Sequence, residues 1–169
     1  MSNPFVLLET SEGDILIELF ADKAPITVEN FLRYVDEGHY DDTIFHRIIK
    51  SFMIQGGGMT LNMKPKPTRE PIVNEATNGL ANKAGTVAMA RAAGRNSATA
   101  QFFINVVDNA SLDHKDDTDA GFGYAVFGQV VEGMDVALKI SKKRTRHFQG
   151  FDDVPVEPIA LISAQRFEL

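Results

Sequence analysis

Residues 44–58, IFHRIIKSFMIQGGG, carry the strongest structural signal in this chain. The run is as apolar as a buried β-strand, yet it contains His46 and Arg47 and ends in a glutamine and three glycines. An arginine keeps its proton in proteins, so a guanidinium in such a run must be paired or must face a cleft. The stretch therefore predicts strands that border a polar site.

The alternation within this stretch leaves the placement of its polar side chains open. In an extended strand, Arg47 shares a face with Phe45 and Ile49. A tight turn at residues 50–51 would direct Arg47 away from Gln55, whereas a bulge or a wider turn would bring the two side chains together. Periodicity alone does not decide between these arrangements.

A second polar face follows in residues 101–107, QFFINVV. Gln101, Phe103 and Asn105 share one face of a strand, while Phe102 and its alternate neighbours are expected in the core. A glutamine that alternates with a phenylalanine suits an amphipathic groove. An edge strand with a solvated face explains the pattern equally well.

The rest of the chain contains mostly strand signals. Strand-like runs lie at residues 5–10, 14–20, 85–91, 122–131 and 158–165. Residues 63–85 are polar and rich in proline, and we expect a long surface loop there. Because the strands mostly follow one another directly, the order favours an antiparallel sheet, sandwich or barrel of about eight strands and two helices.

The clearer of the two helices is marked by apolar residues at i, i+3, i+4 and i+7, namely Val28, Phe31, Leu32 and Val35. Thr27 is the expected N-cap, and Gly38 stands where the helix should end. A shorter helix is expected at residues 134–140. The basic run that follows, residues 139–147, is interpreted as a solvated helix end.

Composition limits the function classes. A chain of 169 residues with 44% hydrophobic and 24% charged residues fits one domain, residues 1–169. The net charge of −6 argues against a nucleic-acid partner, and no stretch approaches the roughly 20 apolar residues of a membrane span. The chain has no cysteine and no recognisable secretory signal, so we expect a cytoplasmic protein.

Other catalytic and binding motifs have weak support. No G-x-S-x-G motif is present, so a serine nucleophile has no sequence support. The acidic residues 113–119 lack the ligand register of a calcium loop, and we expect a solvated loop. The glycines at 56–58 are not followed by the Lys-Ser or Lys-Thr of a phosphate loop and predict close backbone packing or positive φ angles.

At these residues the sequence resembles the cyclophilins, in particular the bacterial cytoplasmic type. The matching runs are TIFHRIIKSFMIQGGG (43–58), GTVAMAR (85–91), SATAQFFINVVDN (97–109) and GYAVFGQVVEGMD (123–135). The resemblance implies a mainly β fold, a closed eight-stranded antiparallel β-barrel capped by two α-helices. It also implies a monomeric peptidyl-prolyl cis-trans isomerase that needs no cofactor or metal and acts on proline-containing peptides and on unfolded or folding proteins.

The resemblance assigns a role to each residue of the expected site. Arg47 is the catalytic residue, and the proline pocket is lined by Phe52, Met53, Phe103 and Leu112. Three further sets complete the expected site: Gln55 and Gln101, which bind the substrate backbone or hold Arg47; Ala90 and Arg91, which offer backbone contacts; and Tyr124, at a position often held by histidine.

Two departures from the family pattern carry expectations of their own. Ser111 stands where an aromatic residue is usual at the pocket rim, so we expect weakened cyclosporin binding with isomerase activity largely kept. Arg91 adds a positive charge near the site and is expected to favour acidic residues around the substrate proline.

Two alternative functions remain open beside the isomerase. The first is a non-catalytic proline-peptide binding module or chaperone on the same scaffold, from which Arg47 and its two supporting glutamines distinguish an enzyme. The second is a β-barrel transporter of a small ligand, which would need a hollow interior. The expected core residues, Phe102, Ile104, Val126 and Phe127, argue for a filled one.

Overall fold

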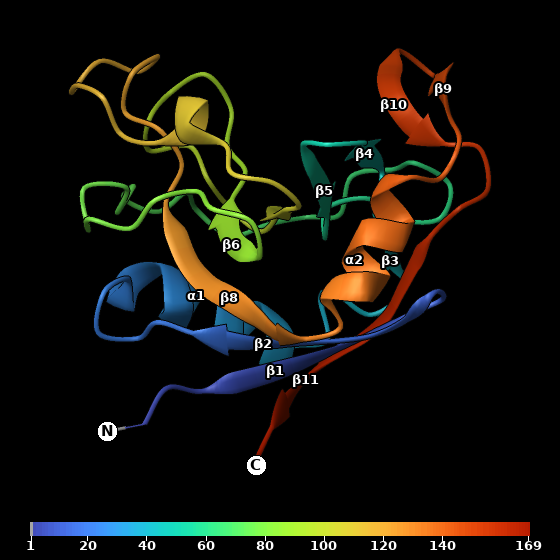
Figure 1. Cartoon of the computed structure of the whole chain (residues 1–169), viewed down its shortest axis with the longest axis horizontal. Coiled ribbons are helices and arrows are strands. Elements are labelled where there is room, and N and C mark those ends of the chain that lie inside the picture. Colours follow the sequence, from blue (N-terminus) through green and yellow to red (C-terminus); the bar gives the residue numbers. More distant parts are fainter. Residues whose placement is uncertain (1) are drawn as a thin grey trace.

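The computed structural model describes residues 2–169 and is built around one strongly curled antiparallel sheet (Figure 1). The strand order is β3-β11-β1-β2-β8-β6-β7-β5-β4. The bounds are β1 Phe5–Thr10, β2 Gly13–Leu19, β3 Thr43–Ile44, β4 Arg47–Ile49, β5 Met53–Gly56, β6 Thr86–Met89, β7 Phe102–Asn105, β8 Val126–Glu132 and β11 Ala160–Phe167. The predicted mainly β, antiparallel architecture with two helices is confirmed.

The predicted closure of the barrel is overstated. The edge strands β3 and β4 are consecutive in the chain, and no ladder joins them within residues 2–169. The two residues between these strands, Phe45 and His46, lack the positive φ angles that a two-residue hairpin turn requires, so the strands do not fold back on each other. The N–H of Phe45, within this link, donates instead to Ile159 O at 3.0 Å. The sheet is therefore a curled half-barrel. Its two edge strands, β3 and β4, follow each other in the chain but do not pair.

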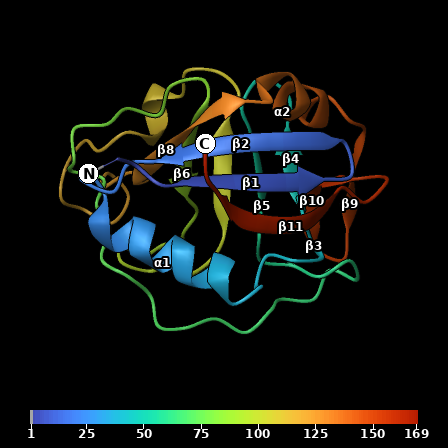
Figure 2. The same cartoon turned by 90° about the horizontal axis from the view of Figure 1, so that it is seen from below.

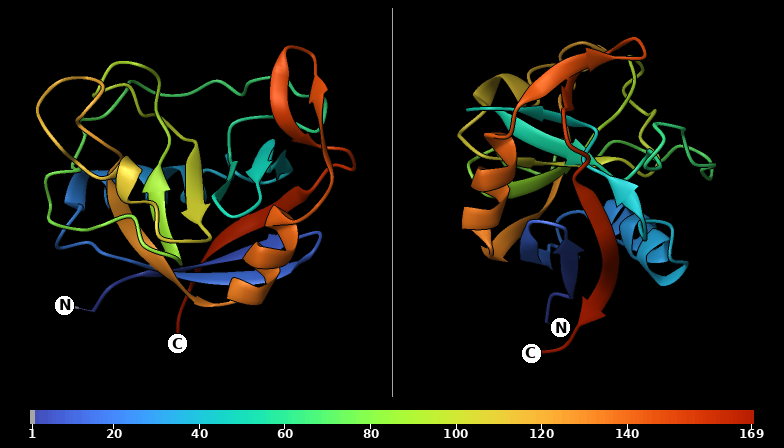
Figure 3. Two further views of the ribbon diagram at one scale, coloured as in Figure 1. Left: turned by 45° about the horizontal axis from the view of Figure 1, so that its top comes forward. Right: turned by 90° about the vertical axis from the view of Figure 1, so that its right-hand side faces the viewer.

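A separate hairpin accounts for two strands that the sequence did not predict. It consists of β9, Thr145–Phe148, and β10, Phe151–Pro155, and it projects from the molecule beside β4 (Figure 3). Gln149 and Gly150 connect them with φ angles of 50° and 84°, as a two-residue hairpin turn with positive φ requires. The expectation of a solvated helix end over residues 139–147 is therefore wrong beyond the end of the second helix.

The two helices lie on opposite sides of strands β1 and β2 (Figure 2). They are α1, Pro25–Asp36, and α2, Met134–Ser141. The predicted apolar stripe of α1 is buried, and Gly38, with φ of 73°, follows its end as expected. No helix of residues 2–169 is long and apolar enough to cross a membrane.

The predicted N-cap of α1 is wrong. The helix begins two residues before Thr27, with Pro25 in its first turn and Ala24 at the cap position. The cap comes from a distant loop: the Glu75 carboxylate accepts hydrogen bonds from the Thr27 N–H at 2.7 Å and from the Ile26 N–H at 3.3 Å. The side chain of Glu75 thus caps the helix, a role that the sequence pattern predicted for Thr27.

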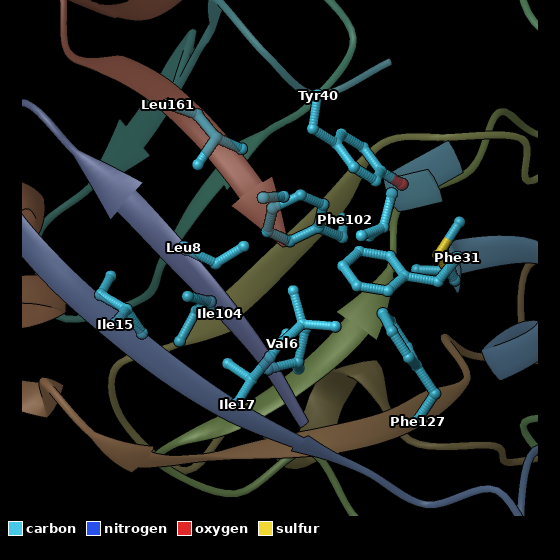
Figure 4. Close-up of a cluster of buried hydrophobic side chains, with 14 of the residues drawn as sticks. Val6, Leu8, Ile15, Ile17, Phe31, Tyr40, Phe102, Ile104, Phe127 and Leu161 are labelled. Atoms are coloured by element: carbon cyan, nitrogen blue, oxygen red, sulfur yellow. The ribbon is translucent and has the colours of Figure 1, made fainter. Parts of the chain in front are cut away.

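The inside of the curled sheet is filled by aliphatic and aromatic side chains (Figure 4). The Phe31 ring lies 5.1 Å from that of Tyr40, 5.5 Å from that of Phe102 and 5.2 Å from that of Phe127, measured between centroids. Ile104 is also fully buried there. This packed interior removes the hollow that a ligand transporter would need.

Val126 does not belong to that interior, contrary to expectation. It packs on the other face of the sheet in a smaller buried cluster with Met53, Ala88, Ala90 and Phe103. A register shift between Val87 and Ala88, where β6 pairs with β8, accompanies this change of face. The middle of the sheet thus has two apolar faces, one on the core and one under the loops that follow β6 and β7.

Candidate active site

The strand register sets three of the expected site residues in one row. Arg47 of β4 lies opposite Gln55 of β5, and Gln55 lies opposite Phe103 of β7. Residues directly opposite each other on one face of an antiparallel pair are near neighbours. The row therefore places a guanidinium, an amide and an aromatic ring next to each other across three strands.

The link between β4 and β5 explains how Arg47 and Gln55 reach the same face. Ile49 pairs with Met53, so three residues, 50–52, form the loop instead of two. Ser51 takes φ of 60° there. The wider of the two turns considered for this stretch is thus the correct one.

In a continuous strand Phe45 and Arg47 would share one face, but in the structure they do not. It is fully buried in the core, as is Ile48. The break between β3 and β4 interrupts the alternation of side chains at residues 45–46. Arg47 is consequently exposed while both of these neighbours point inward.

Side-chain hydrogen bonds link Arg47 to Gln55 and Gln55 to Gln101. Arg47 Nη1 donates to Gln55 Oε1 at 3.4 Å, and Gln55 Nε2 donates to Gln101 Oε1 at 2.9 Å. The absence of a side chain at Gly58 leaves room for the Gln101 side chain, because a Cβ there would lie 2.4 Å from Gln101 Cγ. Among residues 2–169 the long bond to Gln55 is the one side-chain hydrogen bond that Arg47 makes, so its other N–H groups are available to a ligand.

The row opens into a pocket of about 200 Å³. Drug-sized ligands usually occupy about 300–1,000 Å³, so this volume suits a single small ring. Nine of the ten expected site residues line it: Arg47, Phe52, Met53, Gln55, Ala90, Arg91, Phe103, Leu112 and Tyr124. The sequence thus located a set of side chains that the fold brings together from five separate segments.

Gln101, the tenth expected residue, lines an adjoining pocket. Gln55, Ala90 and Arg91 border both pockets, and the second one is completed by Ala92, Ser97 and Thr99, which the sequence analysis did not single out. The Ala90 N–H donates to Gln101 O at 3.0 Å, so a ligand contact from Ala90 would use its carbonyl oxygen.

Buried asparagines that the sequence analysis did not assign support the pocket from behind. Asn105 Nδ2 donates to Asn82 Oδ1 at 3.0 Å, and Asn109 Nδ2 donates to Asn105 Oδ1 at 2.8 Å. The amides of Asn82 and Asn109 also donate to carbonyl groups of three pocket residues, Phe52, Leu112 and Tyr124. The polar positions among these apolar runs were the available signal, since a buried amide must have partners.

His46 is buried, whereas its neighbour Arg47 is exposed. It is 5% exposed, and its Nδ1 is buried with no hydrogen-bond partner among residues 2–169. Burial, and to a lesser extent the positive charge of Arg47, lowers the pKa of His46 to about 4. The ring is therefore neutral at physiological pH, and it packs edge-on near Phe151 of β10 with 6.4 Å between ring centroids.

The acidic loop is solvated, as predicted, at Asp116, Asp117 and Asp119. Hydrogen bonds from Thr118 lower the pKa of the Asp116 carboxyl. Within residues 2–169, histidine, aspartate and glutamate side chains form no group of three or more that could hold a metal ion.

Ser111 is exposed in the short 3₁₀-helix Ala110–Leu112, at the rim where Leu112 enters the pocket.

Comparison with known proteins agrees with this geometry. The family model described as cyclophilin type peptidyl-prolyl cis-trans isomerase/CLD matches residues 5–166. The chain is 58% identical to a peptidyl-prolyl cis-trans isomerase of Streptomyces antibioticus, with 95% of this chain and 96% of that protein covered. It is 54% identical to peptidyl-prolyl cis-trans isomerase B of Escherichia coli, with 94% and 96% covered.

Among solved structures, the fold is similar to a cyclophilin type peptidyl-prolyl cis-trans isomerase of Cryptosporidium parvum, crystallised in the presence of the dipeptide Ala-Pro. The TM-score is 0.79 at 25% identity, and 98% of this chain and 99% of that one are covered. Sequence, fold and relatives lead to one conclusion: the chain belongs to the family of cyclophilin-type peptidyl-prolyl cis-trans isomerases.

Proposed function

We propose that this protein catalyses rotation about X-Pro peptide bonds and that Arg47 is its catalytic residue. The observation that carries the proposal is the row of Arg47, Gln55 and Phe103, which sets a guanidinium beside a small pocket with an apolar wall. The pocket suits a proline ring, and Arg47 lines it, so a ring bound there would bring the preceding bond close to the guanidinium.

The chemistry follows from the peptide bond itself. An amide resists rotation by about 18–20 kcal/mol because its nitrogen shares a lone pair with the carbonyl group. At the twisted midpoint this sharing is lost, and the prolyl nitrogen becomes a hydrogen-bond acceptor. An N–H of Arg47 directed at that lone pair has a partner in the transition state that the ground state lacks, which is the condition for raising kcat.

The apolar wall contributes by holding the ring and excluding water. Phe52, Met53, Phe103 and Leu112 supply this surface. In a site of low dielectric constant, a charged donor interacts more strongly with an acceptor than it does in water. An acceleration of roughly a millionfold needs about 8 kcal/mol of differential stabilisation. No proton leaves Arg47 in this mechanism, as befits a group that stays charged.

The proposal is tested with a protease-coupled assay on an X-Pro tetrapeptide. The wild type is compared with Arg47→Ala and with Arg33→Ala, an exposed arginine on α1, at matched folded concentration. We expect fast isomerisation by the wild type and by Arg33→Ala, and a collapse in Arg47→Ala. A folded wild type that binds the peptide without accelerating its isomerisation would support the non-catalytic binding module.

Substrates are expected to be proline-containing peptides and unfolded or folding chains. The Ala-Pro dipeptide used with the Cryptosporidium parvum structure supports this class of ligand. Uncatalysed X-Pro isomerisation takes roughly 10–100 s at 25 °C and can limit the rate of folding. The refolding of a protein with a native cis-proline should therefore accelerate when the wild-type protein is added.

We infer that cyclosporin binds weakly. Ser111 occupies the exposed rim position where the family usually has an aromatic side chain, so apolar contact area and a possible indole donor are missing there. Ser111→Trp should increase the affinity for cyclosporin while it changes kcat/KM for a tetrapeptide little. Nanomolar inhibition of the wild type would contradict the inference.

We also propose that the protein works as a monomer in the cytoplasm. One chain supplies every residue of the pocket described above, which supports a monomer. Sedimentation at micromolar concentration should give a single species of 18.6 kDa. A dimer that persists on dilution, or recovery of the protein outside the cytoplasm on cell fractionation, would contradict the proposal.

A further inference from the structure

Arg91 binds two loops at once. It follows β6, and its Nε donates to Gly123 O at 3.0 Å while Nη2 donates to Asp119 O at 2.8 Å. Its Nη1 donates to the carbonyl oxygens of Ala92, at 3.0 Å, and Ala93, at 3.1 Å. All three guanidinium nitrogens thus point to main-chain oxygens, within its own loop and within the loop before Tyr124.

The same guanidinium covers one wall of the pocket. Its Cζ lies 4.8 Å from the centroid of the Tyr124 ring, and that ring packs edge-on against Phe103 with 5.7 Å between centroids. The bond to Gly123 O fixes the backbone directly before Tyr124. Arg91 therefore restrains Tyr124 from its backbone and from its ring face together.

Arg91 also lies on the boundary between the pocket with Arg47 and the adjoining pocket with Gln101, since it lines both. A shift of its side chain would change the shape of each. Because all three of its nitrogens donate to carbonyl oxygens, few N–H groups of Arg91 remain for a direct ion pair with the acidic substrate residues expected from the sequence.

We propose that Arg91 is a positioning residue, which holds Tyr124 and the two flanking loops as the wall of the proline pocket and does not select acidic substrates. The proposal rests on the isomerase function proposed above. The proposed role of Arg91 differs from that of Arg47. Arg91 shapes the surface that binds the proline ring and does not contact the rotating bond.

The planar fork of an arginine is essential to this arrangement. A guanidinium offers five N–H groups in fixed directions, whereas a lysine ammonium is a compact point charge on a flexible stem. Lysine can keep the charge but cannot reach the oxygens of Ala92, Asp119 and Gly123 together. The Arg91→Lys variant therefore separates the geometry of the side chain from its charge.

The experiment compares Arg91→Lys and Arg91→Met with the wild type. Arg95→Lys is the matched control, because Arg95 also contacts the acidic loop, through Asp117 O at 2.7 Å, and stacks on Phe122. Kinetics are measured on two tetrapeptides, one with glutamate and one with alanine before proline. The peptide-free proteins are compared through the ring NMR signals of Tyr124, one of only three tyrosines in the chain.

We expect Arg91→Lys and Arg91→Met to raise KM about tenfold, equivalent to about 1.4 kcal/mol, with kcat within about threefold for both peptides. Such a pattern marks a loss of binding that is equal in ground and transition states. The Tyr124 signals should shift in both variants, and Arg95→Lys should match the wild type in every measurement.

Wild-type KM and unshifted Tyr124 signals in Arg91→Lys would overturn the proposal. So would a rise in KM confined to the glutamate peptide in Arg91→Met, which would restore a role for the charge. The NMR comparison needs no catalysis. An inactive wild type with shifted Tyr124 signals in both variants would thus contradict the isomerase function and leave the positioning role of Arg91 supported.

Discussion

At the residue scale, the orientation of the Arg47 guanidinium depends on the missing side chain of Gly58. Gly58 leaves room for Gln101, which accepts from Gln55, which in turn accepts from Arg47. The conformational freedom of glycine is not the reason for its presence at this position. The reason is space, because the atoms nearest to an added methyl group would be those of the Gln101 side chain.

Gly58→Ala should therefore lower kcat/KM by about tenfold, since a displacement of about 1 Å in a site can cost up to about a hundredfold. The flexible Gln101 side chain can move aside, so the free energy of unfolding should change by less than about 1 kcal/mol. Enzyme kinetics and urea unfolding measure the two quantities. Gly94→Ala is the control, because a Cβ there would lie 3.9 Å from its nearest neighbour, Ser97 Cβ. Equal kcat/KM in folded Gly58→Ala would disprove this dependence.

His46 should make stability depend on pH. Its pKa in the folded protein, about 4, lies below the ordinary value of 6.5, so between these values the unfolded chain binds the proton and the folded chain does not. The contribution of His46 is fully present above pH 6.5 and is lost as the pH falls toward 4. Between pH 7 and pH 5 the loss amounts to about 2 kcal/mol.

Urea unfolding at the two pH values checks this expectation. His46→Gln should reduce the pH dependence of the unfolding free energy relative to the wild type. An unchanged dependence in His46→Gln would mean that other groups titrate in this range.

At the scale of secondary-structure elements, α1 relies on a carboxylate from a distant loop. Glu75 accepts from the N–H groups of Ile26 and Thr27 and from the Thr27 hydroxyl at 2.6 Å. Loss of a helix cap costs typically about 1 kcal/mol, with a range of about 0.5–2. Glu75→Ala should lower the free energy of unfolding by about that amount, whereas Glu70→Ala, which changes an exposed residue of the same loop, should not.

Thermal unfolding and the rate of isomerisation together test the cap. Since α1 does not line the pocket, kcat/KM at 25 °C should stay at the wild-type level in Glu75→Ala. Equal stability of the Glu75→Ala and Glu70→Ala variants would show that water replaces the carboxylate without loss.

The elements also show what the sequence could and could not predict. Strands and helices with regular apolar spacing, such as α1, were located correctly. An element that buries one face has apolar residues at a regular spacing, which can be recognised in the sequence. The hairpin of β9 and β10 was missed because its Gln-Gly turn joins mostly polar, exposed residues, which give no period. The cap of α1 was missed because Glu75 is far away in the chain.

At the scale of the whole molecule, the site exists because the centre of the sheet has two apolar faces. One face fills the core around Phe31 (Figure 4), and the other, around Phe103, becomes the floor of the pocket. Nine of the ten expected site residues line one pocket, and motif resemblance identified them. The supporting asparagines and the bracing role of Arg91 depend on contacts between distant segments, which no local pattern encodes.

The central claim is that Arg47 acts on the transition state and not on the bound ground state. NMR exchange spectroscopy on an Ala-Pro peptide measures both the dissociation constant and the rate of isomerisation on the enzyme. For Arg47→Ala we predict a rate reduced by about 100- to 1,000-fold, the typical cost of one transition-state donor, with a dissociation constant within about threefold of the wild type. A variant that isomerises the bound peptide at the wild-type rate, whatever its affinity, would contradict the account.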